Sequence, residues 1–168
     1  MRTTILAALA LAALVTNAAA QTPLKLAGKM ECGKPDPSHM VPVDDTAKHA
    51  LAVGATKCTW SEGTLGGERL KHETDTFISD ATAASSEDRG YGVGAVASGD
   101  KYFVHFKGET SLKDGQPVSA ACTWKFTGGT GKLKGLKGKG TCKGTFQPDG
   151  KARWEINGEY RLAAAGTN

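Results

Sequence analysis

CTWKFTGGTGKLKGLKGKGTC, residues 122–142, begins and ends with a cysteine, and its two halves follow different patterns. In the first half every second residue is an aromatic ring or the cysteine itself, whereas in the last part glycine takes alternate positions before Cys142. A period of two is typical of β-strands, because successive side chains point to opposite faces. The segment therefore predicts two strands joined by a glycine-rich connection.

The register of these two strands can be tested on the sequence itself. In an antiparallel pair with Cys122 opposite Cys142, Trp124 lies opposite Gly140, and Phe126 lies opposite a second glycine. Large rings then face positions without a side chain, which is a favourable cross-strand arrangement. This register predicts a disulfide between Cys122 and Cys142.

The two remaining cysteines, Cys32 and Cys58, are expected to form a second disulfide. Four cysteines allow three pairings, and the sequence does not exclude the other two. Metal binding by the four cysteines is the alternative interpretation. None of them, however, belongs to a Cys-x-x-Cys pair or has a histidine at the spacing of a metal site.

Period-two alternation recurs along the chain, most clearly in residues 153–161, where apolar and charged side chains occupy opposite parities. Similar segments bring the total to about eight strands. We predict an all-β domain in the form of a closed antiparallel barrel, which has no exposed edges; a two-sheet sandwich is the alternative. Residues 34–45 are expected to be an irregular connection and residues 81–88 a mobile loop.

Residues 1–20 have the pattern of a cleavable signal peptide. Arg2 precedes an apolar run at 5–15 that is too short to span a bilayer, and small residues precede Gln21. We expect a mature single domain of residues 21–168 that is periplasmic or secreted and has no transmembrane segment. Without Arg2, the 21 basic residues fall to 20 against 17 acidic ones, a charge too small to indicate a nucleic-acid partner.

The segment 122–142, with a strand that runs into a glycine-spaced turn and returns, resembles allene oxide cyclase-like barrels. Uncharacterised secreted bacterial proteins of that barrel type also share the Cys-Thr-Trp sequence found here at 58–60. The resemblance covers residues 88–162 and implies a closed barrel of about eight strands with one short helical turn near residues 130–137. It implies no active site, because the catalytic residues of the plant cyclases have no matching positions here.

Candidate ligand contacts occur on one parity of the segment 69–78. If that face points into the barrel, His72, Thr74 and Thr76 supply polar groups to an otherwise apolar cavity. Tyr102 and Trp124 are expected to line the same interior. A hydrogen-bonded histidine in a filled core is the alternative.

The opposite face of the same segment carries Glu73 and Asp75. Ion pairs with Lys71 and Arg69 on a solvated surface explain these acids. No motif of a serine hydrolase, zinc protease or phosphate-binding loop accompanies them.

Lysines concentrate in residues 125–143, and no acidic residue occurs between Asp114 and Asp149. A docking patch for an anionic polymer or head group would use Lys132, Lys134, Lys137, Lys139 and Lys143. The alternative is a solvated strand face whose lysines prevent edge pairing. Nucleic acid is disfavoured as a partner because aromatic side chains do not alternate with the lysines.

Suitable ligands for copper or zinc gather in one part of the chain: His39, Met40 and His49, near Cys32, Asp44 and Asp45. Their spacing matches no known motif, and surface or loop-anchoring histidines are the alternative. We predict no metal and no cofactor.

These observations predict an exported, non-enzymatic barrel that binds a small apolar molecule or an anionic cell-surface polymer. A lyase or isomerase that uses the barrel cavity, as in the cyclases, is the alternative. No feature of the sequence indicates the oligomeric state.

Overall fold

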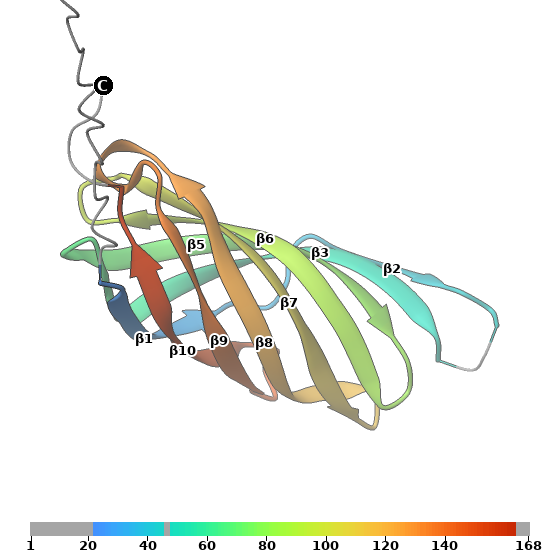
Figure 1. Ribbon diagram of the computed structural model, residues 1–168. Coiled ribbons are helices and arrows are strands. Elements are labelled where there is room, and N and C mark those ends of the chain that lie inside the picture. Colours follow the sequence, from blue (N-terminus) through green and yellow to red (C-terminus); the bar gives the residue numbers. More distant parts are fainter. Residues whose placement is uncertain (1–21, 46–47, 164–168) are drawn as a thin grey trace, which may run out of the picture.

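The computed structural model describes residues 22–45 and 48–163, whose strands wrap around a common axis (Figure 1). In this part of the chain the elements are β1 (Leu24–Cys32), β2 (Ser38–Pro42), β3 (Ala50–Glu62), β4 (Thr64–Leu65), β5 (Glu68–Ala81), β6 (Ser85–Val96), β7 (Lys101–Lys113), β8 (Gln116–Gly129), the 3-10 turn η1 (Gly131–Leu133), β9 (Lys137–Phe146) and β10 (Ala152–Arg161). The predicted signal peptide, residues 1–20, lies outside the described residues. No helix in the described ranges is long and apolar enough to cross a membrane.

Eight strands close into an antiparallel barrel. Neighbours pair in the order β1, β10, β9, β8, β7, β6, β5, and β3 then pairs with both β5 and β1 to complete the ring. The short β4 pairs with β5, and β2 pairs with β3 where that strand extends away from the barrel body in Figure 1. The predicted barrel is confirmed, and the sandwich alternative is wrong.

The register predicted for residues 122–142 is confirmed. β8 and β9 pair with Cys122 opposite Cys142 and Trp124 opposite Gly140. A Cβ atom on Gly140 would overlap the Trp124 ring, so the glycine provides the room that the ring needs. Both predicted disulfides are present, Cys122–Cys142 and Cys32–Cys58.

One end of the barrel is filled with side chains. The predicted helical turn is η1, whose Leu133 is buried together with the nearby Leu136. Leu65 of β4 is also buried there, and the Gly66 N–H donates a hydrogen bond to Tyr160 Oη at 3.1 Å. This packing closes the end of the barrel at which β7 and β9 begin.

The segment predicted as a mobile loop, residues 81–88, is mostly strand. β5 continues to Ala81 and β6 begins at Ser85, and Ser79 pairs with Asp88 in the resulting hairpin. The segment is polar because Ser86 and Asp88 line the barrel interior, and not because it forms a solvated loop. Similarly, β2 lies within residues 34–45, the segment expected to be an irregular connection.

Candidate functional site

The barrel interior contains a cavity of about 360 Å³. Most of its wall is apolar, and it includes eight aromatic rings: Trp60, Phe77, Tyr102, Phe106, Trp124, Phe126, Phe146 and Trp154. The cavity reaches the barrel end opposite to η1, where the lining residues Met40 and Pro117 are exposed to solvent. Small-molecule pockets typically have volumes of roughly 300–1,000 Å³, so this cavity is large enough for a small ligand.

Two carboxylic acids line the inner part of the cavity. Glu73 and Asp75 belong to β5 and are only 5% and 8% exposed. Their inward orientation follows from a β-bulge, since the register with β6 shifts between Leu70 and His72. One extra residue, Lys71, reverses the parity of the rest of the strand.

Glu73 is held in place by a hydrogen bond, whereas one carboxyl oxygen of Asp75 has no hydrogen-bond partner among the described residues. Tyr102 Oη donates to Glu73 Oε2 at 2.6 Å, and Trp60 Nε1 donates to Tyr102 Oη at 2.8 Å. By contrast, Asp75 Oδ1 is buried and has no hydrogen-bond partner among the described residues. A buried polar atom without a partner costs about 1–3 kcal/mol, so Asp75 is a point at which a ligand can gain a hydrogen bond.

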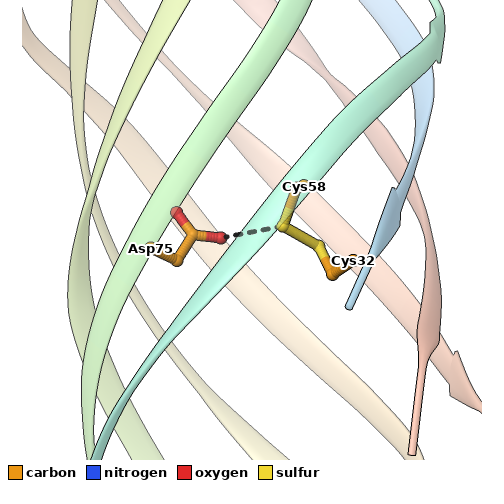
Figure 2. Close-up of side chains that lie close together, drawn as sticks. All are labelled: Cys32, Cys58 and Asp75. Atoms are coloured by element: carbon orange, nitrogen blue, oxygen red, sulfur yellow. Dashed lines mark hydrogen bonds between the residues drawn. A yellow bond between two sulfur atoms is a disulfide. The ribbon is translucent and has the colours of Figure 1, made fainter. Parts of the chain in front are cut away.

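Figure 2 shows the other oxygen of Asp75 next to the Cys32–Cys58 disulfide. Asp75 Oδ2 lies 3.7 Å from Cys58 Sγ. A disulfide sulfur has no proton to donate, so this contact is a hydrogen bond only when Asp75 itself is protonated. Among the described residues these three side chains also form a group whose potential metal-ligating atoms lie within 4.8 Å of one another. The two sulfurs are bonded to each other and are not thiolates, so the group does not provide a metal site.

The pKa values of the buried groups are raised. Loss of hydration raises the pKa of Glu73, against the opposing effect of the Tyr102 hydrogen bond. Burial, followed by the negative charge of Glu73, raises the pKa of Asp75 well above its ordinary value of 3.8. Burial also raises the pKa of Tyr102, which therefore remains a hydrogen-bond donor. Both acids therefore retain a proton more readily than exposed carboxyl groups do.

Strand β6 makes room for these side chains with glycines at alternate positions in residues 90–94. A Cβ atom on Gly92 would lie 2.5 Å from Glu73 Oε1 and 2.6 Å from Asp75 Oδ1. On Gly94 it would overlap the Tyr102 ring. The glycine spacing is the one sequence signal of this site, because it marks a wall against which larger side chains from neighbouring strands lie.

A third acid, Asp88, lies nearer the exposed end of the cavity. It accepts hydrogen bonds from Ser79 Oγ at 2.5 Å, Ser86 Oγ at 3.0 Å and Thr110 Oγ1 at 2.6 Å. All four residues line the cavity. The three hydroxyl groups satisfy this carboxylate, which distinguishes it from Asp75.

The predicted ligand contacts fall on two sides of the barrel wall. Tyr102 and Trp124 line the cavity. His72, Thr74 and Thr76 are exposed on the outer face of β5, so the prediction that they face the interior is wrong. The bulge at Lys71 is the physical reason, because it exchanges the inner and outer parities.

The same bulge overturns the interpretation of Glu73 and Asp75 as surface ion-pair partners. Both acids are buried inside the barrel, whereas Lys71 and Arg69 are exposed on its outer face. The acids therefore belong to the cavity.

Acidic neighbours interrupt the predicted lysine patch. Lys132 Nζ lies 3.1 Å from Glu68 Oε1. On the outer face of the barrel, Lys143 of β9 lies opposite Glu155 of β10, and Lys139 lies opposite Glu159. Anion binding by this patch, which also includes Lys134 and Lys137, stays a prediction.

The potential metal ligand His49 is engaged with two carboxylates. Its Nδ1 lies 2.6 Å from Asp45 Oδ1, and its Nε2 lies 2.8 Å from Asp80 Oδ1. The hydrogen bond with Asp80, followed by that with Asp45, raises the pKa of His49. Cys32 of the same potential ligand set is part of a disulfide. His49 therefore connects the segment before β3 to β5, in agreement with the loop-anchoring alternative.

No protein-family model matches the sequence, and no curated protein matches it significantly. Among solved structures, the chain is similar to a DUF3224-family protein of unknown function from Shewanella oneidensis MR-1. The TM-score is 0.52 and the identity 17%, over 86% of this chain and 100% of that chain. This similarity shows the fold alone.

The chain is also similar to the pterocarpan synthase dirigent protein GePTS1, with a TM-score of 0.48 and 11% identity over 88% of this chain and 91% of that chain. At that score the likeness carries no argument about function. The comparisons support a barrel fold and do not single out the allene oxide cyclase-like proteins.

Proposed function

We propose that this protein is a non-enzymatic binding protein that holds a small, largely apolar molecule inside its barrel. The observation that carries this proposal is the cavity of about 360 Å³, whose aromatic wall surrounds an unsatisfied acceptor, Asp75 Oδ1. In ligand pockets an apolar wall supplies most of the contact area, and a few polar groups fix the orientation. The cavity has both.

The packing around the cavity supports a binding role. The interior of an eight-stranded barrel is small enough for side chains to fill it completely. Here, however, Trp124 lies against Gly140 and Tyr102 lies against Gly94. Rings that lie along the wall in this way leave the middle of the barrel accessible to a ligand.

Export is part of the proposal. Disulfides persist in the periplasm and outside the cell, and the two disulfides of this barrel fit such a compartment. The signal-peptide pattern of residues 1–20 supports the same conclusion. We therefore propose that the protein is periplasmic or secreted.

Dye binding tests the proposed cavity. N-phenyl-1-naphthylamine, a neutral dye that fluoresces more strongly in apolar surroundings, is expected to bind the folded protein at a single saturable site. Ala52 lines the cavity, and an indole at this position would occupy space that the dye needs. Ala52→Trp is therefore expected to weaken dye binding by about tenfold or more, or 1.4 kcal/mol.

Val53→Trp is the matched control, because Val53 is the next residue of β3 and points outward with 45% exposure. It is expected to keep the dye affinity of the parent protein. Equal weakening by both variants, or dye fluorescence that does not saturate, would contradict the proposed cavity.

A second candidate is a lyase or isomerase that uses the same cavity, and the acid pair is the observation that favours it. Glu73 and Asp75 can retain a proton in apolar surroundings, as proton transfer to a bound molecule requires. The fate of the bound molecule separates the two candidates. A binding protein releases its ligand unchanged on denaturation, whereas a lyase or isomerase yields a rearranged or cleaved product, which mass spectrometry and NMR identify.

A further inference from the structure

All charged side chains that line the cavity are acidic. Among the described residues these are Glu73, Asp75 and Asp88, and the lining contains no lysine, arginine or histidine. The whole chain has the opposite balance, with a net charge of +4. A cavity lined by one sign of charge attracts the opposite charge and repels its own, so this interior favours cations over anions.

The inner acids are arranged to receive a hydrogen-bond donor. Asp75 is only 8% exposed, and its Oδ1 atom has no hydrogen-bond partner in the described part of the chain. Glu73 Oε1 approaches the same glycine, Gly92, as Asp75 Oδ1 does. The other oxygens of the two acids contact the Tyr102 hydroxyl and the disulfide. A donor placed near Gly92 therefore meets two carboxyl oxygens, one of which accepts no hydrogen bond from the described residues.

The chemistry of this position distinguishes an ammonium group from other donors. An ammonium group offers three N–H donors together with a positive charge, whereas an alcohol offers one donor and no charge. A positive charge also offsets the cost of burying carboxylates away from water. A carboxylate ligand would add a further negative charge to the acids and would be repelled.

We propose that the cavity selects amphiphilic amines, with the protonated nitrogen between Glu73 and Asp75 and the apolar body along the aromatic wall. This inference rests on the proposed binding function and specifies its ligand class. The binding function and the preference for amines would be contradicted by different results of the following experiment.

Isothermal titration calorimetry of the oxidised protein at pH 7 compares three probes of equal chain length: octylamine, 1-octanol and octanoate. Octylamine is expected to bind about tenfold more tightly than 1-octanol, or more, and octanoate is expected to bind most weakly. Asp75→Asn is expected to weaken octylamine binding by about tenfold and to change 1-octanol binding by less than about threefold. Glu73→Gln provides a second variant with the same expected selectivity, so the test does not depend on one substitution.

Glu87→Gln is the matched control, because Glu87 is an exposed acid on the outer face of β6. It removes one negative charge without touching the cavity and is expected to leave octylamine binding within about threefold of the parent protein.

Three results would overturn the inference. If 1-octanol binds as tightly as octylamine, or octanoate binds most tightly, the cavity does not select amines, but the proposed binding function stands. If none of the three probes binds while N-phenyl-1-naphthylamine does, the inference again fails alone. If the dye also fails to bind, the proposed function fails with it.

Discussion

Reduction of the two disulfides is expected to lower the free energy of unfolding by roughly 6 kcal/mol. The Cys32–Cys58 and Cys122–Cys142 bridges join residues 26 and 20 positions apart. Loops of that length correspond to about 3 kcal/mol each through the entropy of the unfolded chain. Domains have in total only about 5–15 kcal/mol of stability, so the reduced barrel is expected to be marginally stable. Guanidinium unfolding with and without a phosphine reductant measures the difference.

Paired replacements separate the two bridges. Cys122→Ala with Cys142→Ala removes one bridge, and Cys32→Ala with Cys58→Ala removes the other; each pair is expected to cost about 3 kcal/mol. Reductant should then shift each double variant by the contribution of its remaining bridge alone. An unfolding midpoint that is the same with and without reductant would mean that strand pairing stabilises the barrel without help from the bridges.

Asp75→Asn is expected to stabilise the barrel at pH 8 and to reduce its pH dependence. Burial, followed by the charge of Glu73, raises the pKa of Asp75 above its ordinary value of 3.8. The folded protein thus keeps a proton that the unfolded chain loses above about pH 4, and stability falls as the pH rises from there to the folded pKa. Asparagine has nearly the same shape and needs no proton. The slope that it removes is at most about 1.4 kcal/mol per pH unit.

Thermal unfolding between pH 4 and pH 8 measures this effect. The two proteins are expected to have similar Tm values near pH 4, and the variant is expected to be more stable by about 5 °C or more at pH 8. The raised pKa of His49 also contributes to pH dependence, but His49 is present in both proteins and cancels in the comparison. A Tm difference that does not vary with pH would show that Asp75 is ionised over the whole range.

Strands with uninterrupted alternation could be predicted from the sequence together with their partners. For β8 and β9, the two cysteines and the glycines opposite Trp124 and Phe126 all indicate the same register. A covalent constraint and a steric match thus support each other. Because neither depends on distant parts of the chain, local sequence was sufficient.

The acid pair could not be predicted in this way because a single residue changes the parity of β5. With a fixed period of two from Leu70, His72 faces inward and Glu73 outward. The bulge at Lys71 gives the opposite result, with Glu73 buried and His72 exposed. A bulge has no fixed signature in composition. Its presence is required here by the packing of Glu73 and Asp75 against Gly92 on the neighbouring strand, a contact made only in the folded barrel.

The polar composition of residues 81–88 led to a wrong prediction of a loop at the exposed end of the cavity. Ser86 and Asp88 belong to a small, polar segment of the kind that usually forms loops. In the barrel, hydroxyl groups from β5, β6 and β7 satisfy the Asp88 carboxylate. The segment can therefore be a strand, because its polar side chains are hydrogen-bonded to one another across the sheet.

β1 and β10, the first and last strands of the barrel, pair with each other, so the barrel can close only after the end of the chain has been synthesised. All nine residues of β1 have partners in β10, from Leu24 with Tyr160 to Cys32 with Ala152. A ribosome adds roughly 5–20 residues per second, so β1 is made on the order of ten seconds before the strand that completes it. During that interval one edge of β1 has no partner and is open to pairing with other chains. The growing chain cannot close its ring by stages, and the barrel forms only after its last strand has been made.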